Sequence, residues 1–562
     1  MQKMIAFITF ESPWFRAGGI GAVMAQLPGA AQAIGKRRTV VITPFHNKSP
    51  KLNDLNLESI ARVELKYRGD PVAVEVLTHT SGCPWFFLKV VDGSFFNGER
   101  HPYDVSKEDL LRNSLIFGVA AVKALPCLAD YFGLPQPEVE WHLVAQDWEA
   151  STALLAFKSQ DAAQGRLHLT LHNSYDEFAT PENFASVGIN PDLCPGDTIL
   201  HRALLLCEQP VFTVSDQFAL DFTQDLLQRE VMAPQLQELL RNMDVLGVDN
   251  GPFVSLAPEA AHLQQAAHGD YAALKEWKAG SRRKALLALD AHHPTESAPL
   301  WGDRNQFRRE ADSLWFVMAG RDDPRQKGYD VAALAVEEYL AEHHGQAGCA
   351  QFLFFPSPGD EGLPGLRFMQ ALAERFPADV IAFPFLWGDG FKAALRGATY
   401  GLMPSLYEPF GMANEFYLAG GCVGIGRATG GNLEQIVPLR SSAACNRAVR
   451  SRAERYHALS SFPTGILFRE RDRIASALDD WRAINDAQYR LGGEEPSRVT
   501  QRQGYFVFQE MANELRIAIE DGVRLYTQDP TLYYRMIAEG VAHIQRTFSW
   551  ERAGQEYARK VR

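Results

Sequence analysis

Ser405-Leu406-Tyr407-Glu408-Pro409-Phe410-Gly411 is followed, about twenty residues later, by Arg427-Ala428-Thr429-Gly430-Gly431-Asn432-Leu433. The first stretch places Glu408 at the head of a predicted helix, where its carboxylate can hold sugar hydroxyls. The second opens a predicted helix with glycines, and the first N–H groups of a helix suit a diphosphate because they have no partner within it. Together at the rim of one parallel sheet, the two stretches predict a nucleotide-sugar site.

Short apolar runs alternate with longer helical patterns, which predicts parallel sheets covered on both faces. In the first half we expect strands at 4–10, 38–44, 85–91, 140–145, 167–171 and 211–214, and helices at about 20–34, 107–126, 149–159 and 216–229. In the second half we expect strands at 314–319, 351–355, 379–385, 399–403 and 422–426, and helices at 365–376 and after 391 and 411. The fold class is therefore α/β, with two Rossmann-like doubly wound sheets, one in each half.

The length of 562 residues is too great for a single core. We expect an N-terminal domain over 1–255, a helical linker or insertion over 256–312, a C-terminal nucleotide-sugar-binding domain over 313–535 and a last helix within 536–562. The insertion is rich in Ala, Gln, His, Arg and Lys. A second, polar insertion is expected over 438–460.

Composition excludes several classes of protein. A net charge of −12 disfavours a nucleic-acid-binding surface, because neutralising a phosphate backbone needs an excess of basic residues. The seven cysteines are scattered, so reduced thiols in a cytosol are the simplest interpretation. No run of about eighteen apolar residues occurs, so no membrane span is expected and the predicted location is cytoplasmic.

A glycine-rich loop follows the first predicted strand, at Trp14-Phe15-Arg16-Ala17-Gly18-Gly19-Ile20-Gly21. Glycines there let the backbone approach a ligand at the edge where open α/β sheets bind; the alternative is a plain tight turn. The loop is not G-x-G-x-x-G, which disfavours a nicotinamide site. Asp147-Trp148 and His172-Asn173 also follow predicted strands, so a shared site at one sheet edge is expected.

A basic loop opens the second half at Gly320-Arg321-Asp322-Asp323-Pro324-Arg325-Gln326-Lys327-Gly328. Arg321 and Lys327 after a buried strand suit a leaving diphosphate, which two cations can neutralise without a metal ion. The alternative is a solvated basic loop, the usual environment of Arg and Lys.

These motifs together resemble the bacterial glycogen and starch synthases and, more broadly, the two-domain retaining glycosyltransferases with the GT-B fold. The matches occur in family order over nearly the whole chain: Gly18-Gly19-Ile20-Gly21, Asp147-Trp148, His172-Asn173, Thr213-Val214-Ser215, Asn250-Gly251, Arg321 with Gln326-Lys327-Gly328, Met403-Pro404-Ser405 with Glu408-Pro409-Phe410-Gly411, Thr429-Gly430-Gly431, and Phe548-Ser549-Trp550. The chain departs from the family pattern at Arg16 (usually lysine), at Glu149 (usually histidine) and at Phe416, where a second glutamate is usual; Glu415 lies one position earlier. The loop from Arg321 to Lys327 is also one residue longer than in the bacterial synthases.

The resemblance implies two domains facing a cleft, with the C-terminal helix crossing back to the first. It implies transfer of glucose from ADP- or UDP-glucose to the non-reducing end of an α-1,4-glucan with retention of configuration. Catalytic roles fall on His172, Arg321, Lys327 and Glu408, with His172 beside the anomeric carbon and the two cations on the departing phosphates. Substrate contacts are implied for Arg16, Gly18, Gly19, Asp147, Asn173, Asn250, Tyr407, Phe410, Gly411, Thr429, Gly430 and Gly431. No cofactor and no metal are expected beyond the nucleotide-sugar.

Several alternatives stay open at this point. Another retaining GT-B enzyme with a small-sugar or glycan acceptor fits the same motifs. A silenced homologue that binds carbohydrate or nucleotide is suggested by the departures at Arg16, Glu149 and Phe416. A nicotinamide-dependent Rossmann enzyme is the fold-level alternative. The sequence does not distinguish an adenine from a uridine donor, and it does not fix the acceptor or the oligomeric state.

Overall fold

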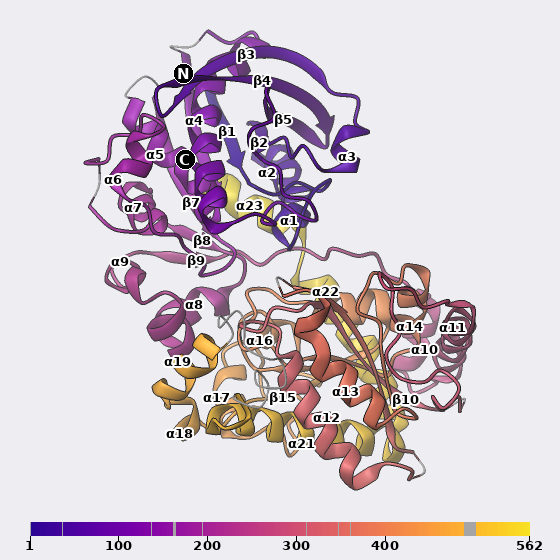
Figure 1. Cartoon of the computed structure of the whole chain (residues 1–562). Coiled ribbons are helices and arrows are strands. Elements are labelled where there is room, and N and C mark those ends of the chain that lie inside the picture. The colour runs from indigo at the N-terminus through magenta and orange to yellow at the C-terminus, as the bar shows by residue number, and fades with distance from the viewer. Residues whose placement is uncertain are drawn as a thin grey trace. The chain divides into compact units, whose positions relative to one another are not determined.

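The structure, a computed structural model, consists of two compact units (Figure 1). Unit 1 comprises Met1–Gly251 and Phe548–Arg562, and unit 2 comprises Pro252–Thr547. Residues 2–35, 37–135, 138–160, 164–193, 195–310, 312–346, 348–359, 361–487 and 502–561 are described. Cys194 lies outside these ranges.

Unit 1 is built on a nine-stranded sheet in the order β3-β4-β5-β2-β1-β6-β7-β8-β9. Its strands are β1 (Gln2–Ile8), β2 (Arg38–Pro44), β3 (Glu58–Tyr67), β4 (Asp70–Ser81), β5 (Cys83–Val90), β6 (Val139–Gln146), β7 (Gly165–Leu171), β8 (Val211–Thr213) and β9 (Val245–Gly247). The ladder from β5 to β9 is parallel, whereas β3-β4-β5 is antiparallel. The predicted doubly wound sheet is therefore confirmed, with an antiparallel extension at one edge.

The helices of unit 1 begin at caps and breaks that the sequence provides. They are α1 (Ile20–Met24), α2 (Leu27–Gly35), α3 (Pro50–Asn53), α4 (Lys107–Tyr131), α5 (Asp147–Gln160), α6 (Pro181–Ala185), α7 (Ile199–Leu206), α8 (Asp216–Gln224), α9 (Gln237–Leu240) and α23 (Trp550–Lys560). The single helix expected at 20–34 is two helices, with Pro28 in the first turn of α2. The Ser106 side chain caps α4 by accepting the N–H of Asp109.

Helix α4 is long and apolar enough to cross a membrane by length and composition alone, with a mean hydropathy of 1.4 over its most apolar window. The sequence prediction recognised no such segment. In the structure 72% of that window is buried inside the protein. Gly118 lets α4 approach α5 closely, since a Cβ there would lie 2.5 Å from the Thr152 carbonyl carbon. The helix is thus part of the core of unit 1.

The C-terminal helix α23 packs within unit 1. The Tyr557 ring stacks on Phe212 of β8 with centroids 4.5 Å apart, and its hydroxyl lies 2.8 Å from Thr170 Oγ1. A Cβ at Gly554 would lie 2.7 Å from the carbonyl carbon of Ala30 in α2. The stretch that returns to unit 1 is therefore Phe548–Arg562, because α22 (Pro530–Thr547) still belongs to unit 2.

Unit 2 contains a six-stranded, wholly parallel sheet in the order β12-β11-β10-β13-β14-β15. Its strands are β10 (Leu314–Arg321), β11 (Ala350–Ser357), β12 (Val380–Ala382), β13 (Tyr400–Met403), β14 (Val423–Arg427) and β15 (Ile466–Phe468). Its helices are α10 (Ala260–Ala267), α11 (Ala272–Ala291), α12 (Tyr329–His343), α13 (Arg367–Arg375), α14 (Asp389–Gly397), α15 (Ala413–Glu415) with the π-helix η5 (Phe416–Gly420), α16 (Asn432–Gln435), α17 (Arg447–Ala453), α18 (Asp472–Ala475), α19 (Leu478–Asp486), α21 (Phe506–Gln528) and α22.

The two expected insertions are both packed into unit 2. In α11, buried Lys278 donates to the carbonyl of Gly421 at 2.7 Å, and Arg282 Nε donates to that of Gly397 at 2.8 Å. These bonds join 256–312 to η5 and α14, so the segment is no separate linker. In 438–460, Ser442 Oγ donates to Asp521 Oδ2 at 2.5 Å and Cys445 is buried. This segment, predicted as a polar insertion, is therefore partly core.

Candidate active site

Lys327 and Glu408, predicted from separate motifs, form one ion pair in unit 2. Lys327 Nζ lies 2.9 Å from Glu408 Oε2 and 3.1 Å from Oε1, and Ser405 Oγ donates to Oε2 at 2.8 Å. The side chains are 19% and 6% exposed, respectively. The cation expected at the phosphates and the carboxylate expected at the sugar thus adjoin one another.

Backbone contacts hold the basic loop against the Glu408 loop. The N–H of Leu406 donates to the carbonyl of Gln326 at 2.7 Å. Gly328 has φ +68°, and a Cβ there would lie 2.3 Å from the Pro404 carbonyl oxygen. Both the left-handed φ and the short distance to Pro404 therefore require a glycine at position 328. Arg321, the last residue of β10, pairs with Asp323 at 3.1 Å.

Gly430 and Gly431 pack directly on the same loop. Gly430 has φ +45°, and a Cβ on it would lie 1.6 Å from the carbonyl oxygen of Glu408. The N–H of Gly431 donates to that oxygen at 3.1 Å, and a Cβ at Gly431 would lie 2.0 Å from the carbonyl oxygen of Phe410. The structure therefore brings Lys327, Glu408 and Gly430 together.

The helix expected after Gly431 differs from the prediction. It is α16, which has only four residues and ends at Gln435. The N–H groups of Thr429 and Gly431 already donate to the carbonyls of Arg427 and Glu408. A dipole from one helical turn is small, so the predicted role of this glycine-led helix tip in binding a diphosphate is not supported.

The remaining predicted residues of the Glu408 motif form part of the core. Tyr407 is 1% and Phe410 is 5% exposed, and Gly411 has φ +97° with Asn432 Oδ1 2.7 Å from where its Cβ would lie. Phe416, which stands where a second glutamate was expected, is also buried: a Cβ at Gly401 would lie 2.3 Å from its ring. These buried side chains support the Glu408 loop from inside unit 2.

In unit 1, the Glu11 carboxylate organises the glycine-rich loop after β1. Its Oε1 accepts the N–H groups of Ala17 at 3.4 Å and Gly18 at 3.1 Å, and its Oε2 accepts that of Gly21 at 3.0 Å. The hydroxyl of Tyr103, from the loop before α4, is close enough to lower the pKa of Glu11. Burial raises the pKa of Glu11, and these hydrogen bonds oppose the shift.

Asp147 holds His172 and Asn173 in place. Its Oδ1 accepts the N–H of His172 at 2.6 Å, and its Oδ2 accepts from Asn173 Nδ2 at 2.7 Å. Asp147 is buried and has φ +60°, a strained conformation for a residue with a side chain. Since both of its carboxylate oxygens are engaged, it orients the two residues that were predicted beside it.

Burial also sets the protonation states around Asp147. It lowers the pKa of His172 to about 3, so the imidazole is neutral at pH 7, and Nε2 donates to Gln146 Oε1 at 2.8 Å. Burial raises the pKa of Asp147 to about 8, although the bonds from His172 and Asn173 lower it. Burial and the charge of Asp147 raise the pKa of Glu149 well above its usual value. Glu149, at the position where the family pattern has a histidine, is therefore a buried carboxyl group whose ionisation is disfavoured.

Arg16 and Asn250 complete the predicted set in unit 1. Arg16 is exposed on the glycine-rich loop, and within the described residues no acid pairs with it. Asn250 is buried three residues beyond β9. Its neighbour Gly251 lets Trp550 approach, since a Cβ there would lie 2.5 Å from the Trp550 nitrogen. Glu11, Asp147, His172 and Asn250 thus follow β1, β6, β7 and β9 at one edge of the sheet.

Sequence reasoning missed an aromatic platform in unit 2. The ring of Phe383, after β12, stacks on Phe355 of β11 with centroids 5.1 Å apart and on Trp387 with centroids 4.1 Å apart. Phe355 lies two residues before Ser357, which pairs with Arg321 across the sheet. The only sequence signal was the density of aromatic residues over 383–391, and none of the motifs included it.

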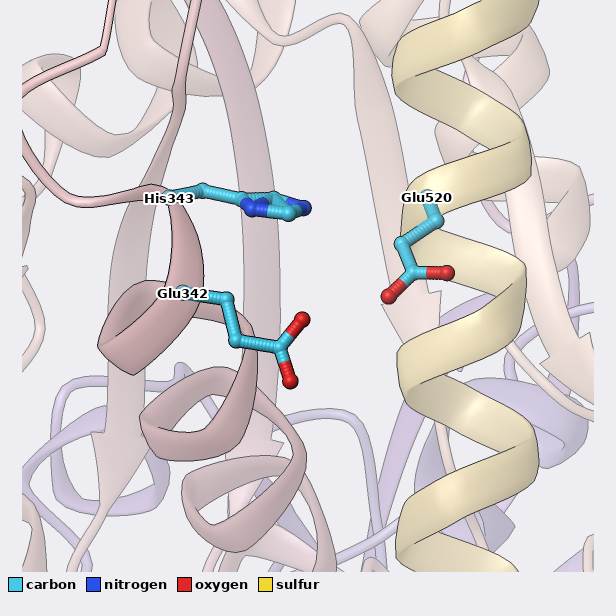
Figure 2. Close-up of side chains that lie close together, drawn as sticks. All are labelled: Glu342, His343 and Glu520. Atoms are coloured by element: carbon cyan, nitrogen blue, oxygen red, sulfur yellow. The ribbon is translucent and has the colours of Figure 1, made fainter.

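Among the described residues, one group of side chains has a spacing that could suit a metal ion, namely Glu342 and His343 at the end of α12 and Glu520 on α21 (Figure 2). Glu342 is exposed, the other two are half-buried, and Glu520 is paired with Arg516. Exposed acids of this kind are common without a metal, so the cluster is not assigned as a site.

Comparisons with known proteins found a family model, related sequences and a similar fold. The family model described as the starch synthase catalytic domain matches residues 4–242. A glycogen synthase from Anaeromyxobacter dehalogenans (strain 2CP-C) is 27% identical over 448 residues, covering 76% of this chain and 84% of the relative. A glycogen synthase from Dechloromonas aromatica (strain RCB) is 26% identical over 450 residues, covering 77% and 84%. The solved catalytic domain of starch synthase IV from Arabidopsis thaliana, bound to ADP and acarbose, has a TM-score of 0.68 at 16% identity over 100% of this chain and 98% of that one.

The two parallel-sheet units and these similarities make the chain a glycosyltransferase with the GT-B fold. Within that class it is a relative of the glycogen and starch synthases, as the motifs had indicated.

Gly19→Ala is expected to leave the melting temperature unchanged and to lower kcat/KM for the nucleotide-sugar about tenfold or more. Gly19 is exposed, its φ is not positive, and a Cβ on it would meet nothing within 4 Å, so the backbone itself does not require glycine. Gly29→Ala in α2 is the matched control, because it also has open space but lies outside the loop. Parental kinetics for Gly19→Ala would favour the plain-turn interpretation.

Proposed function

We propose that the chain transfers glucose from ADP- or UDP-glucose to the non-reducing end of an α-1,4-glucan, with retention of configuration. The observation that carries this proposal is the convergence of Lys327, Glu408 and Gly430 on one loop of unit 2. A cation beside a buried carboxylate can neutralise a departing diphosphate while the carboxylate holds sugar hydroxyls.

The residues of unit 1 fit the acceptor side of the same reaction. A neutral His172, fixed by Asp147 and Gln146, carries no charge that would oppose an oxocarbenium-like state. Asn173 is oriented by the same carboxylate and can bond to a hydroxyl. Arg16 supplies an exposed cation on the loop with Gly18 and Gly19.

A silenced homologue is the second candidate, since Phe416 and Glu149 occupy positions that differ from the family pattern. Phe416, at the position where the resemblance implies a second glutamate, is buried, while Arg321, Lys327 and Glu408 are all present. We favour the enzyme on that ground. We also propose a cytoplasmic location, because the six described cysteines are free thiols, and a glucan as partner, with neither cofactor nor metal required.

Transfer of radiolabelled glucose tests the proposal. With ADP-glucose or UDP-glucose as donor, label should enter glycogen or maltose, and an α-1,4-specific hydrolase should release it. Label appearing in fructose instead would show a small-sugar transferase. If neither transfer nor donor hydrolysis occurs, but ADP or UDP raises the melting temperature, the protein is a silenced nucleotide-binding homologue.

A further inference from the structure

The loop after β1 has two kinds of glycine. A Cβ at Gly21 would lie 2.7 Å from the carbonyl oxygen of Ser12, so this glycine is required by packing. Gly19 is exposed and its Cβ position is open. Gly18, which directly precedes Gly19, donates its N–H to Glu11. The contacts that fix the loop are therefore made by the residues on either side of Gly19.

Glu11 provides that anchor. It is buried, and its two oxygens accept three N–H groups that span five residues, from Ala17 to Gly21. The N–H groups of Gly18 and Gly21 are consequently taken up by a buried side chain of the protein. The start of the loop is fixed separately, because Ser12 and Phe15 exchange two backbone hydrogen bonds of 3.1 Å.

Tyr103 supports Glu11 from a different part of the chain. Its hydroxyl is close enough to the Glu11 carboxylate to lower the pKa of that group, and its ring stacks on Phe10 with centroids 5.9 Å apart. Asp147 is close enough for the charge of Glu11 to contribute to its raised pKa. The carboxylate that shapes the glycine loop is thus within electrostatic range of the one that orients His172 and Asn173.

We propose that Glu11 is a positioning residue of the transferase: by taking up the N–H groups of Ala17, Gly18 and Gly21, it sets the shape in which the exposed Gly19 meets the nucleotide-sugar. The inference rests on the proposed function. Glu11 does not touch the substrate and acts through the loop. A carboxylate is needed because glutamine would turn an N–H donor toward one of the loop N–H groups.

Glu11→Gln tests this. We expect kcat to fall about 10- to 100-fold, while the Kd for ADP or UDP, measured by calorimetry, stays within about threefold, because Arg321 and Lys327 are untouched. We also expect amide exchange in peptides covering 15–24 to be about tenfold faster or more. Asp92→Asn is the matched control, since Asp92 also accepts a loop N–H, that of Ser94 at 3.0 Å, but lies outside the site. It should change none of these quantities.

Tyr103→Phe is a second variant in case Glu11→Gln fails to fold, because it keeps the Glu11 carboxylate and removes the hydroxyl that lowers the pKa of that group. It should lower kcat by a smaller factor, with the same unchanged Kd. Parental kcat in Glu11→Gln, or an equal loss of kcat and nucleotide affinity, would overturn the inference. If the parental chain transfers no glucose at all, the proposed function fails instead. In that case, unchanged amide exchange in Glu11→Gln would still refute the anchoring of the glycine loop by Glu11.

Discussion

Lys327→Ala is expected to lower kcat by about 10²- to 10³-fold, the usual cost of removing one preorganised charge from a site where anionic charge develops. Lys327 is largely buried and bonds both oxygens of Glu408, so its ammonium group has a fixed position. The substitution should leave the fold intact, since Glu408 keeps the hydrogen bond from Ser405. Initial rates with ADP-glucose and UDP-glucose measure the effect.

The ion pair raises the question whether Lys327 acts on the phosphates or only holds Glu408. A double-mutant cycle with Glu408→Gln separates the two roles. If Lys327 only positions Glu408, adding Lys327→Ala to Glu408→Gln should cost little further activity; a direct role predicts a second, additional loss. Lys392→Ala is the control, because Lys392 is exposed and pairs with Asp389 at 2.9 Å in the same unit. Parental rates for Lys327→Ala on both donors would contradict the assigned role.

The sequence predicted the buried strands well because most of them contain a short apolar run. The strand expected at 38–44 is β2, and 314–319 falls within β10. It did not predict the hairpin of β3 and β4, because β3 is largely exposed or half-buried and rich in charged residues and β4 carries exposed residues at both ends. The hairpin turn does have a local signal, Arg68-Gly69, because both residues have positive φ.

The sequence named candidate site residues from their motifs, but it named neither Glu11 nor the contacts among these residues. The pairing of Lys327 with Glu408 joins residues 81 positions apart, and Tyr103 reaches Glu11 from outside any motif. Such contacts depend on tertiary packing, which motif spacing does not reveal. The short length of α16 could have been foreseen, because Pro438 disfavours a helical conformation at Val437 and the β-branched Ile436 precedes it.

Gly430→Ala is expected to lower the free energy of unfolding of unit 2 by about 2–5 kcal/mol. Part of this cost is the left-handed φ of +45°, and the rest is overlap with the Glu408 carbonyl oxygen, 1.6 Å from the new Cβ. Relieving this overlap requires a shift of the Glu408 loop or of the Thr429-Gly430-Gly431 loop. The Glu408 carboxylate should therefore move relative to Lys327. Glucose transfer should fall at temperatures where the variant is still folded, as chemical denaturation and rate measurements on the same sample will show.

Gly345→Ala isolates the backbone contribution to that cost. Gly345 has φ +76° just beyond α12 in the same unit, and a Cβ on it would meet nothing within 4 Å. It should therefore lose only about 1 kcal/mol and retain parental activity. The difference between the two variants measures how tightly the Thr429-Gly430-Gly431 loop is packed on Glu408. Equal losses in both would mean that the two loops are not pressed together, and the convergence on which the proposed donor site depends would have to be abandoned.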